Sequence, residues 1–384
     1  MRKRIFNVLF VSVFAVMLGL GIVAPLMPLY AENLGATGVW LGLIFAGFSL
    51  TRAIFTPIMG RLSDRRGRKR FICLGLFLYS AISLLYTVAG DVLTLTGVRL
   101  IHGFASAMVI PIAMAYIGET TERGEEGKTM GTFSMAFFLG MGSGPVVGGF
   151  MNDSFGIESV FYAMSGLTAL AFVTTVLFLP DVQDETHGGK SQETSFREVI
   201  KDNLMRGIIL FRIVSAMRRG GVMAFLPILA SRIGVTPSRV GILLTLVIFL
   251  TALLQRTFGK LADRYDRILL VVAGSLIGTL GLMCFPLAEN FGGLLLVGAF
   301  VGVGGAVAMP SGTAMAVQVG QKVGMGTSMG IFNSSMSVGM VLAPMLSGVF
   351  MDLTGIESVF YIIGSISLLG TVGFWLLTRV SCRA

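Results

Sequence analysis

Residues that build metal, redox and catalytic sites are scarce in this sequence of 384 residues, which contains three cysteines and two histidines. Cys73, Cys284 and Cys382 show no Cys-x-x-Cys spacing and cannot all pair with one another. This pattern indicates isolated reduced thiols and excludes a disulfide framework or a zinc finger. We therefore expect no metal site and no other cofactor.

Acidic side chains are absent from the interior of the long apolar segments, and none occurs between Asp202 and Asp263. An enzyme embedded in a membrane needs paired acids, a serine with a histidine, or a metal cluster at membrane depth. His102 is the only histidine in an apolar segment, and no acid accompanies it. We therefore expect that the chain is not an enzyme.

Apolar residues are abundant, at 54% of the chain against 13% charged residues. A helix of about 20 apolar residues spans a bilayer, and lipid forces such segments to be helical because it offers no partner to backbone polar groups. We predict twelve transmembrane helices, at approximately 5–30, 38–60, 70–90, 93–117, 128–151, 157–179, 205–230, 237–258, 268–287, 291–316, 323–350 and 355–378.

Basic residues gather in alternate loops. They occur at Arg2–Arg4 before the first segment, at Arg65–Arg70 after the second, and at Lys190–Lys201 in the central loop. Because basic loops stay on the cytoplasmic side, we expect a multi-pass protein of the inner (cytoplasmic) membrane with both termini in the cytoplasm. The net charge of +9 then reflects topology and attraction to anionic lipid, since it is dispersed over several loops and does not form a nucleic-acid-binding surface.

The same pattern occurs twice, at a constant offset of 199 residues (355 against 156, and 263 against 64). Gly156–Tyr162 recurs letter for letter as Gly355–Tyr361, and the Asp-Arg pair at position 64 recurs at position 263. Parallel repeats in a chain this apolar are a transporter architecture. We predict an all-α integral membrane protein with two six-helix bundles, residues 1–180 and 204–384, joined by a cytoplasmic linker at 181–203.

The turn after the second segment, Gly60–Arg70 (GRLSDRRGRKR), places one acid among six cations. An aspartate here can cap a helix or pair with an arginine, and such a pair breaks if two halves of the protein rock apart. The alternative is a basic loop that sets topology only, which a degraded copy at Gly259–Arg267 disfavours. The residues that we assign to a conformational latch are Gly60, Asp64, Arg65, Gly67 and Arg68, with Asp263 and Arg264 in the copy.

Gly60–Arg70 resembles the signature loop of the major facilitator superfamily, Gly-x-Leu-x-Asp-Arg-x-Gly-Arg-Lys/Arg. Two more segments are similar to motifs of its twelve-span drug:proton antiporters. In Arg99–Gly103, which is similar to Arg-x-x-Gln-Gly, His102 replaces glutamine. A further segment matches Gly-x-x-x-Gly-Pro-x-x-Gly-Gly through Gly140, Gly144, Pro145, Gly148 and Gly149. The resemblance covers the whole chain and implies two bundles that rock about a central cavity, with the last motif as a smooth face for close helix contact.

Ionisable residues inside a membrane are costly and are candidates for function. Arg52 lies twelve residues before Asp64, which places it about 18 Å along the helix from the cytoplasmic loop. The repeat aligns Arg218 and Arg219 with the middle of the first segment. We assign Arg52, Arg218 and Arg219 to a substrate-binding cavity; the alternatives are snorkelling to the interface and pairing between helices.

Arg99 and His102 share one helix face one turn apart, and we assign both to the coupling of transport to protons. Histidine titrates near neutral pH; the alternative is that His102 only hydrogen-bonds between helices. The resemblance implies a membrane-embedded acid in exporters of lipophilic cations, and this sequence has none. Its absence favours neutral, amphiphilic or anionic substrates.

These features predict a secondary active transporter that exports small amphiphilic, drug-like molecules across the inner membrane by alternating access and proton-coupled antiport. The alternative is transport of an organic anion, a metabolite or a lipid-linked substrate by exchange or facilitated flow. A sensor that kept the fold but lost transport is a further alternative. The expected partners are the substrate, protons and the lipid bilayer, with no nucleic acid, and the expected state is a monomer.

Overall fold

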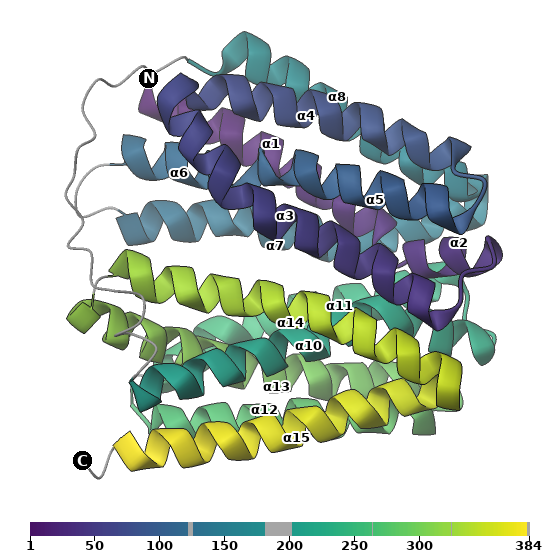
Figure 1. Ribbon diagram of the computed structural model, residues 1–384, viewed down its shortest axis with the longest axis vertical. Helices are drawn as coiled ribbons and strands as arrows, with labels where there is room; N and C mark the ends of the chain where they lie inside the picture. Colours follow the sequence, from purple (N-terminus) through teal and green to yellow (C-terminus); the bar gives the residue numbers. More distant parts are fainter. Residues whose placement is uncertain (122–125, 181–201, 263, 324, 382–384) are drawn as a thin grey trace. The chain divides into compact units, whose positions relative to one another are not determined.

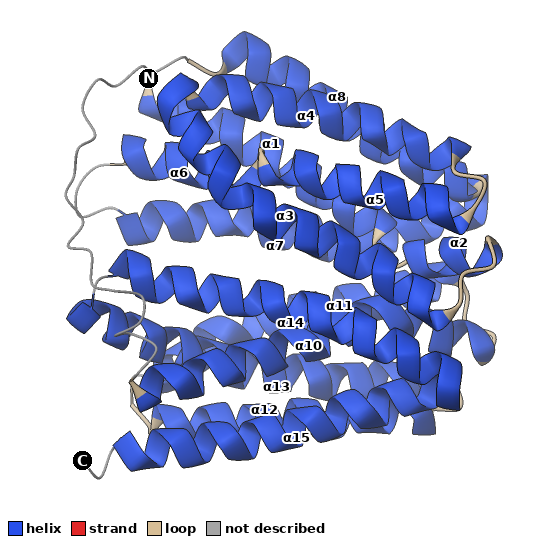
Figure 2. Cartoon of the chain, in the orientation of Figure 1, coloured by secondary structure: helices blue, strands red, loops and turns tan. Residues whose placement is uncertain are grey.

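The computed structural model describes residues 1–121, 126–180, 202–262, 264–323 and 325–381. These residues form α-helices, two short 3-10 helices and the turns that connect them (Figure 2). Helices satisfy their backbone hydrogen bonds internally, as a chain surrounded by lipid must. Residues 181–201 of the predicted linker, and also Asp263 and Cys382, lie outside the described residues.

The first compact unit combines described residues of Met1–Glu185 with Gly234–Thr245. Within it, α1 packs mainly against α7 and α8, α3 packs against α5, and α4 packs against α8 (Figure 1). Its helices are α1 (Arg2–Val23), α2 (Met27–Asn33), α3 (Gly38–Arg66), α4 (Arg68–Leu85), η1 (Tyr86–Val88), α5 (Val92–Ala107), α6 (Ile110–Thr120), α7 (Glu126–Phe155) and α8 (Ile157–Phe178).

The second compact unit combines described residues of Thr186–Ile233 with Leu246–Ala384. Here α10 packs against α14 and α15, and α12 packs against α13. Its helices are α10 (Asn203–Arg232), the later part of α11 (Pro237–Ala262), α12 (Arg267–Cys284), η2 (Phe285–Leu287), α13 (Phe291–Val323), α14 (Met325–Thr354) and α15 (Ile356–Ser381).

Eleven helical segments among the described residues are long and apolar enough to cross a membrane. The remaining predicted span, 128–151, falls on α7, which has 30 residues. The prediction of an all-helical protein with many membrane spans is therefore confirmed.

Three details of the predicted spans are wrong. The span at 5–30 is divided, because α1 ends at Val23 and α2 begins at Met27. The span at 93–117 is broken into α5 and α6, because Pro111 at the start of α6 has no N–H to donate to the preceding turn. The last turn of α6 also includes Glu119, so this span, Val92–Thr120, contains an acid that the predicted span excluded.

The repeated segment folds in the same way in both units. Gly156 and Gly355 precede α8 and α15 with φ of 79° and 92°, a conformation that favours glycine. Ser159 and Ser358 then each donate a 2.6 Å hydrogen bond to the carbonyl of that glycine. Identical local sequence therefore produces identical helix starts.

Aspartates begin three other helices. Asp91, Asp202 and Asp266 accept hydrogen bonds of 2.8–2.9 Å from the backbone N–H groups at the starts of α5, α10 and α12. Each satisfies a donor that the helix leaves unpaired. The hydrogen bonds from the backbone and hydroxyl of Thr94 hold the pKa of Asp91 below its usual value.

Candidate functional site

The signature loop is a tight turn between α3 and α4. Gly67 joins the two helices with φ of 95°, which a side chain would strain. One turn earlier, Asp64 Oδ1 lies 2.8 Å from a guanidinium nitrogen of Arg68. Arg68 also forms a two-pronged ion pair with Glu119 at the end of α6, through Nε at 2.6 Å and a second nitrogen.

Arg68 therefore joins two carboxylates within the first unit. The side chain of Arg68 is 14% exposed and that of Asp64 is 54% exposed, so the contact with Glu119 is the more shielded one. Sequence reasoning assigned Asp64 and Arg68 but missed Glu119. The signal was the first acid after a long apolar segment, at the predicted cytoplasmic end of that span.

The other latch residues differ in their surroundings. Arg65 and Arg264 are exposed, and Gly60 has open space where a Cβ would stand. Asp263 lies outside the described residues, so the structure does not describe an equivalent pair in the second unit.

The glycines of the α7 motif lie against the backbone of α1. A Cβ at Gly140 would lie 2.7 Å from the Phe14 carbonyl oxygen, and one at Gly144 would lie 2.5 Å from Gly21 Cα. A Cβ at Gly148 would collide with the carbonyl of Ile22. Pro145 lies within the helix. Three glycines at i, i+4 and i+8 thus form the surface that lets α1 and α7 touch.

Gly149 contacts a different segment of the first unit. A Cβ there would lie 2.5 Å from the carbonyl oxygen of Pro237, at the start of α11. Close by, Asp153 Oδ2 accepts a 3.1 Å hydrogen bond from the backbone N–H of Ser238. The motif therefore carries two close-packed edges, one toward α1 and one toward residues 237–238.

His102 and Arg99 are buried in an aromatic cluster. His102 is 0% exposed, and its Nδ1 lies 2.8 Å from the hydroxyl of Tyr86 in η1. The ring of Tyr79 stands edge-on to the imidazole at 4.0 Å between centroids. Arg99 lies over the ring of Phe48 at 4.8 Å and also interacts with Tyr86.

Several polar atoms of this cluster have no hydrogen-bond partner among the described residues. They are His102 Nε2, Arg99 Nε, the Tyr79 hydroxyl and the Ser106 hydroxyl. Buried polar atoms are normally satisfied, so such a group marks a place where a proton or a water molecule can be accommodated. Sequence reasoning found Arg99 and His102 but not the two tyrosines.

The predicted cavity arginines have different environments. Arg52 in α3 is half-buried, and Tyr79 lies in its electrostatic field. Arg219 in α10 is exposed on the second unit. Arg218, its neighbour, is 6% exposed and donates hydrogen bonds to the Ser275 carbonyl (3.2 Å), Thr279 (3.0 Å) and Ser367 (2.9 Å).

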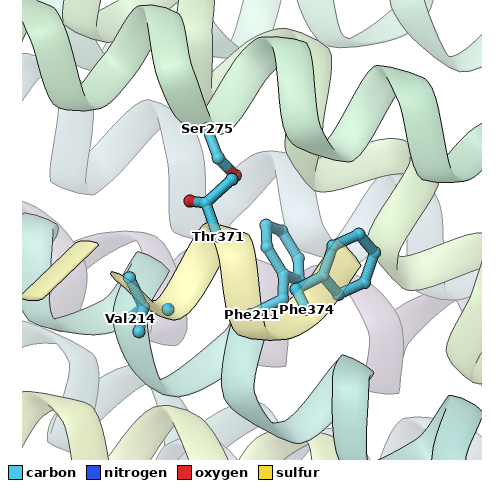
Figure 3. Close-up of a pocket in the computed structure, with 6 residues that line it drawn as sticks. Phe211, Val214, Ser275, Thr371 and Phe374 are labelled. Carbon is cyan, nitrogen blue, oxygen red and sulfur yellow. The ribbon is translucent and has the colours of Figure 1, made fainter. Parts of the chain in front are cut away.

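Arg218 therefore ties α10 to α12 and α15. The side chains beside this tie are tightly packed: Phe211, Val214, Ser275, Thr371 and Phe374 surround a pocket with no room for a water molecule (Figure 3). The second unit is hollowed elsewhere, in an open groove of about 720 Å³. The groove is lined by Gln255, Arg267, Pro310, Thr313, Ala314, Val317, Gln318 and Gln321.

The sequence model of the Major Facilitator Superfamily matches residues 9–217 and 208–381. The chain belongs to the major facilitator superfamily. It is 33% identical to an uncharacterised MFS-type transporter of Methanocaldococcus jannaschii. The alignment of 365 residues covers 94% of each chain. It is 28% identical over 380 residues to the quinolone resistance protein NorA of Staphylococcus aureus, which covers 97% of this chain and 96% of the relative.

The fold agrees with this membership. A solved bacterial homologue of the human lysosomal transporter Spinster superposes with a TM-score of 0.83 at 15% identity, covering 98% of this chain and 97% of that one. The chain is therefore a multi-pass membrane protein and a secondary transporter of this superfamily, and not an enzyme.

Proposed function

We propose that this transporter exports small amphiphilic molecules across the inner membrane by proton-coupled antiport. The observation that carries the proposal is the α7 motif, whose Gly140, Gly144 and Gly148 all meet the backbone of α1. The motif is the one that resembles drug:proton antiporters, and it is used here as a contact surface. The similarity to a quinolone resistance protein along nearly the whole chain gives further support.

The proposed proton carrier is His102, with Arg99 as its partner in coupling. Tyr86 Oη and His102 Nδ1 share one hydrogen bond, and we assign the tyrosine hydroxyl as its donor in the neutral state; Nε2 then carries the proton and has no partner among the described residues. Protonation at Nδ1 requires Tyr86 to turn and accept the hydrogen bond. The nearby cation of Arg99 opposes the extra charge, so a small displacement of Arg99 is enough to change proton affinity.

In this proposal the substrate contacts Arg52, which is half-buried, and Arg219, which is exposed. We assign Arg218 to holding the second unit together, because oxygens of α12 and α15 occupy its guanidinium. The Asp64–Arg68–Glu119 group latches the outward-open state from the cytoplasmic side, where we also place both termini. The protein acts as a monomer.

The test uses purified protein in liposomes with an acidic lumen and a pH-sensitive dye inside. A lipophilic cation, a neutral amphiphile and an organic anion are added in turn. We expect the neutral or anionic compound to raise the luminal pH, and His102→Gln to abolish this rise. Arg379→Gln is the matched control, because this arginine of α15 is exposed and far along the chain from the proposed sites. A response confined to the lipophilic cation would refute the proposed substrate class.

The second candidate function is exchange or facilitated flow of an organic anion, a metabolite or a lipid-linked substrate. It is favoured by α10, which carries Arg212, Arg218 and Arg219 and no acid. Counterflow of a labelled anion in liposomes without a pH gradient distinguishes the two. Uptake that needs no gradient and moves no proton supports the second candidate over antiport.

A further inference from the structure

Arg212 is a buried cation whose neighbours provide no negative charge. It lies in α10 and is 6% exposed. One terminal nitrogen lies 3.2 Å from the sulfur of Met309 in α13, and the other lies 2.9 Å from the sulfur of Met336 in α14. Its Nε has no hydrogen-bond partner among the described residues, and its guanidinium lies 4.4 Å from the Phe332 ring centroid.

Thioether sulfur is a weak acceptor, so this cage leaves most of the hydrogen-bonding capacity of the guanidinium unused. The sequences of α10 and α13 contain no acidic residue. The only acid of α14, Asp352, lies 16 residues after Met336, or about 24 Å along the helix. A buried charge is normally paired, and here none of the three helices that surround Arg212 supplies the partner.

Arg218 shows how the same unit satisfies an arginine that has only a structural role. The two side chains are equally buried, at 6% exposed. Arg218 donates to three oxygens, whereas the two contacts that the structure gives Arg212 are to sulfur. The two arginines differ in their hydrogen-bond acceptors and not in their burial. This difference indicates that Arg212 binds an acceptor that does not belong to the chain.

We propose that Arg212 is the anion-binding residue of the second unit and takes the carboxylate of an amphiphilic organic anion. Met309 and Met336 cover the guanidinium in this structure and move aside when the anion binds, since methionine has three rotatable bonds. Phe332 and the two thioethers then contact the apolar body of the ligand. The planar fork of arginine suits a carboxylate, which can accept two hydrogen bonds at once.

Arg219 is placed to receive the anion first. It lies seven residues after Arg212 on the same face of α10, about 10 Å along the helix, and its side chain is exposed. An anion can therefore pass from the exposed to the shielded cation without leaving this face. The inference rests on the proposed function and deepens it, because it specifies the charge of the substrate and the residue that binds this charge.

The test compares 2-naphthoate with 2-naphthamide, which has the same body and no charge. Binding to the purified full-length protein in detergent is measured by titration calorimetry, without any pH gradient. We expect naphthoate to bind the wild type, and Arg212→Met to weaken it by about 10- to 100-fold, the range of a lost charge-assisted hydrogen bond. Arg212→Lys keeps the charge and should fall between the two.

Three controls keep the result interpretable. Arg379→Met removes another arginine that lies over an aromatic ring, at 4.3 Å from Trp375, and should leave naphthoate affinity unchanged. Naphthamide affinity should be the same in the wild type and in Arg212→Met. An unchanged melting temperature in Arg212→Lys shows that its lower affinity does not come from unfolding.

Equal naphthoate affinity in the wild type and Arg212→Met would overturn the inference, and so would a wild type that binds neither probe. Binding of naphthamide alone would overturn it too, while leaving export of neutral amphiphiles intact. Naphthoate binding that depends on Arg212, in a protein that moves no protons in the liposome assay, would keep the inference and refute the proposed antiport.

Discussion

Replacing Gly144 with alanine tests the contact between α1 and α7 most directly. The new Cβ would lie 2.5 Å from both the Cα and the carbonyl carbon of Gly21. Carbon atoms pack favourably at 3.5–4.0 Å, so the two helices must separate by about 1 Å at this point. Both atoms belong to backbone, and no side-chain rotation can relieve the clash.

Overpacking of this kind costs about 1–3 kcal/mol of unfolding free energy. For a unit of this size the expected fall in melting temperature is about 2–10 °C. Gly166→Ala in α8 is the matched control, since a Cβ there would have nothing within 4 Å. Alanine is the better helix former, and so this control should melt at the wild-type temperature or slightly above it.

Thermal unfolding of the purified proteins in detergent, followed by circular dichroism, provides the measurement. Gly144→Ala should melt below both the wild type and Gly166→Ala. If Gly144→Ala melts together with Gly166→Ala, the close packing of α7 on α1 is not a constraint. The physical reading of the motif as a contact surface would then be refuted.

Other features of the structure predict further outcomes. Gly67→Ala should destabilise the protein by about 1–3 kcal/mol because φ is +95°, whereas Gly60→Ala, in open space, should not; thermal melting compares them. Asp91 has a lowered pKa when folded, so its capping stabilises the protein above the unfolded-state pKa and is lost as the pH falls through the folded value. Asp91→Ala should thus lower the melting temperature more at pH 7 than at pH 3, and an equal loss at both would contradict this. Glu119→Gln should release Arg68 and raise the rate at which trypsin cleaves there; an unchanged rate would show that the ion pair does not restrain the loop.

The helical fold could be read from the sequence because lipid removes the alternatives. Apolar segments of about 20 residues must become helices, and the repeat of Gly156–Tyr162 at Gly355–Tyr361 predicts the same helix start twice. The break between α1 and α2 and the break between α5 and α6 were the exceptions. Pro111 ends one helix and begins another, whereas Pro310, its equivalent in the repeat, lies inside the unbroken α13. Proline marks a weak point, and packing decides whether the helix breaks there.

The candidate site was predicted in part. The sequence motifs located Gly67, Gly144 and Arg99, because each depends on local backbone geometry or on a pattern within one helix. Glu119 was missed, since its partner Arg68 lies 51 residues earlier and on another helix. The hydrogen bond between Tyr86 and His102 was missed for the same reason.

The arginines of α10 show most clearly what each level determines. The sequence alone establishes that Arg212, Arg218 and Arg219 lie in one membrane helix, that no acid accompanies them, and that 212 and 219 share a face. Only the tertiary structure shows that Arg218 has three oxygen acceptors and that Arg212 faces two sulfurs and a phenyl ring. Helical periodicity fixes the direction of a side chain. The acceptors it meets come from other helices, which the chain brings together only when it folds.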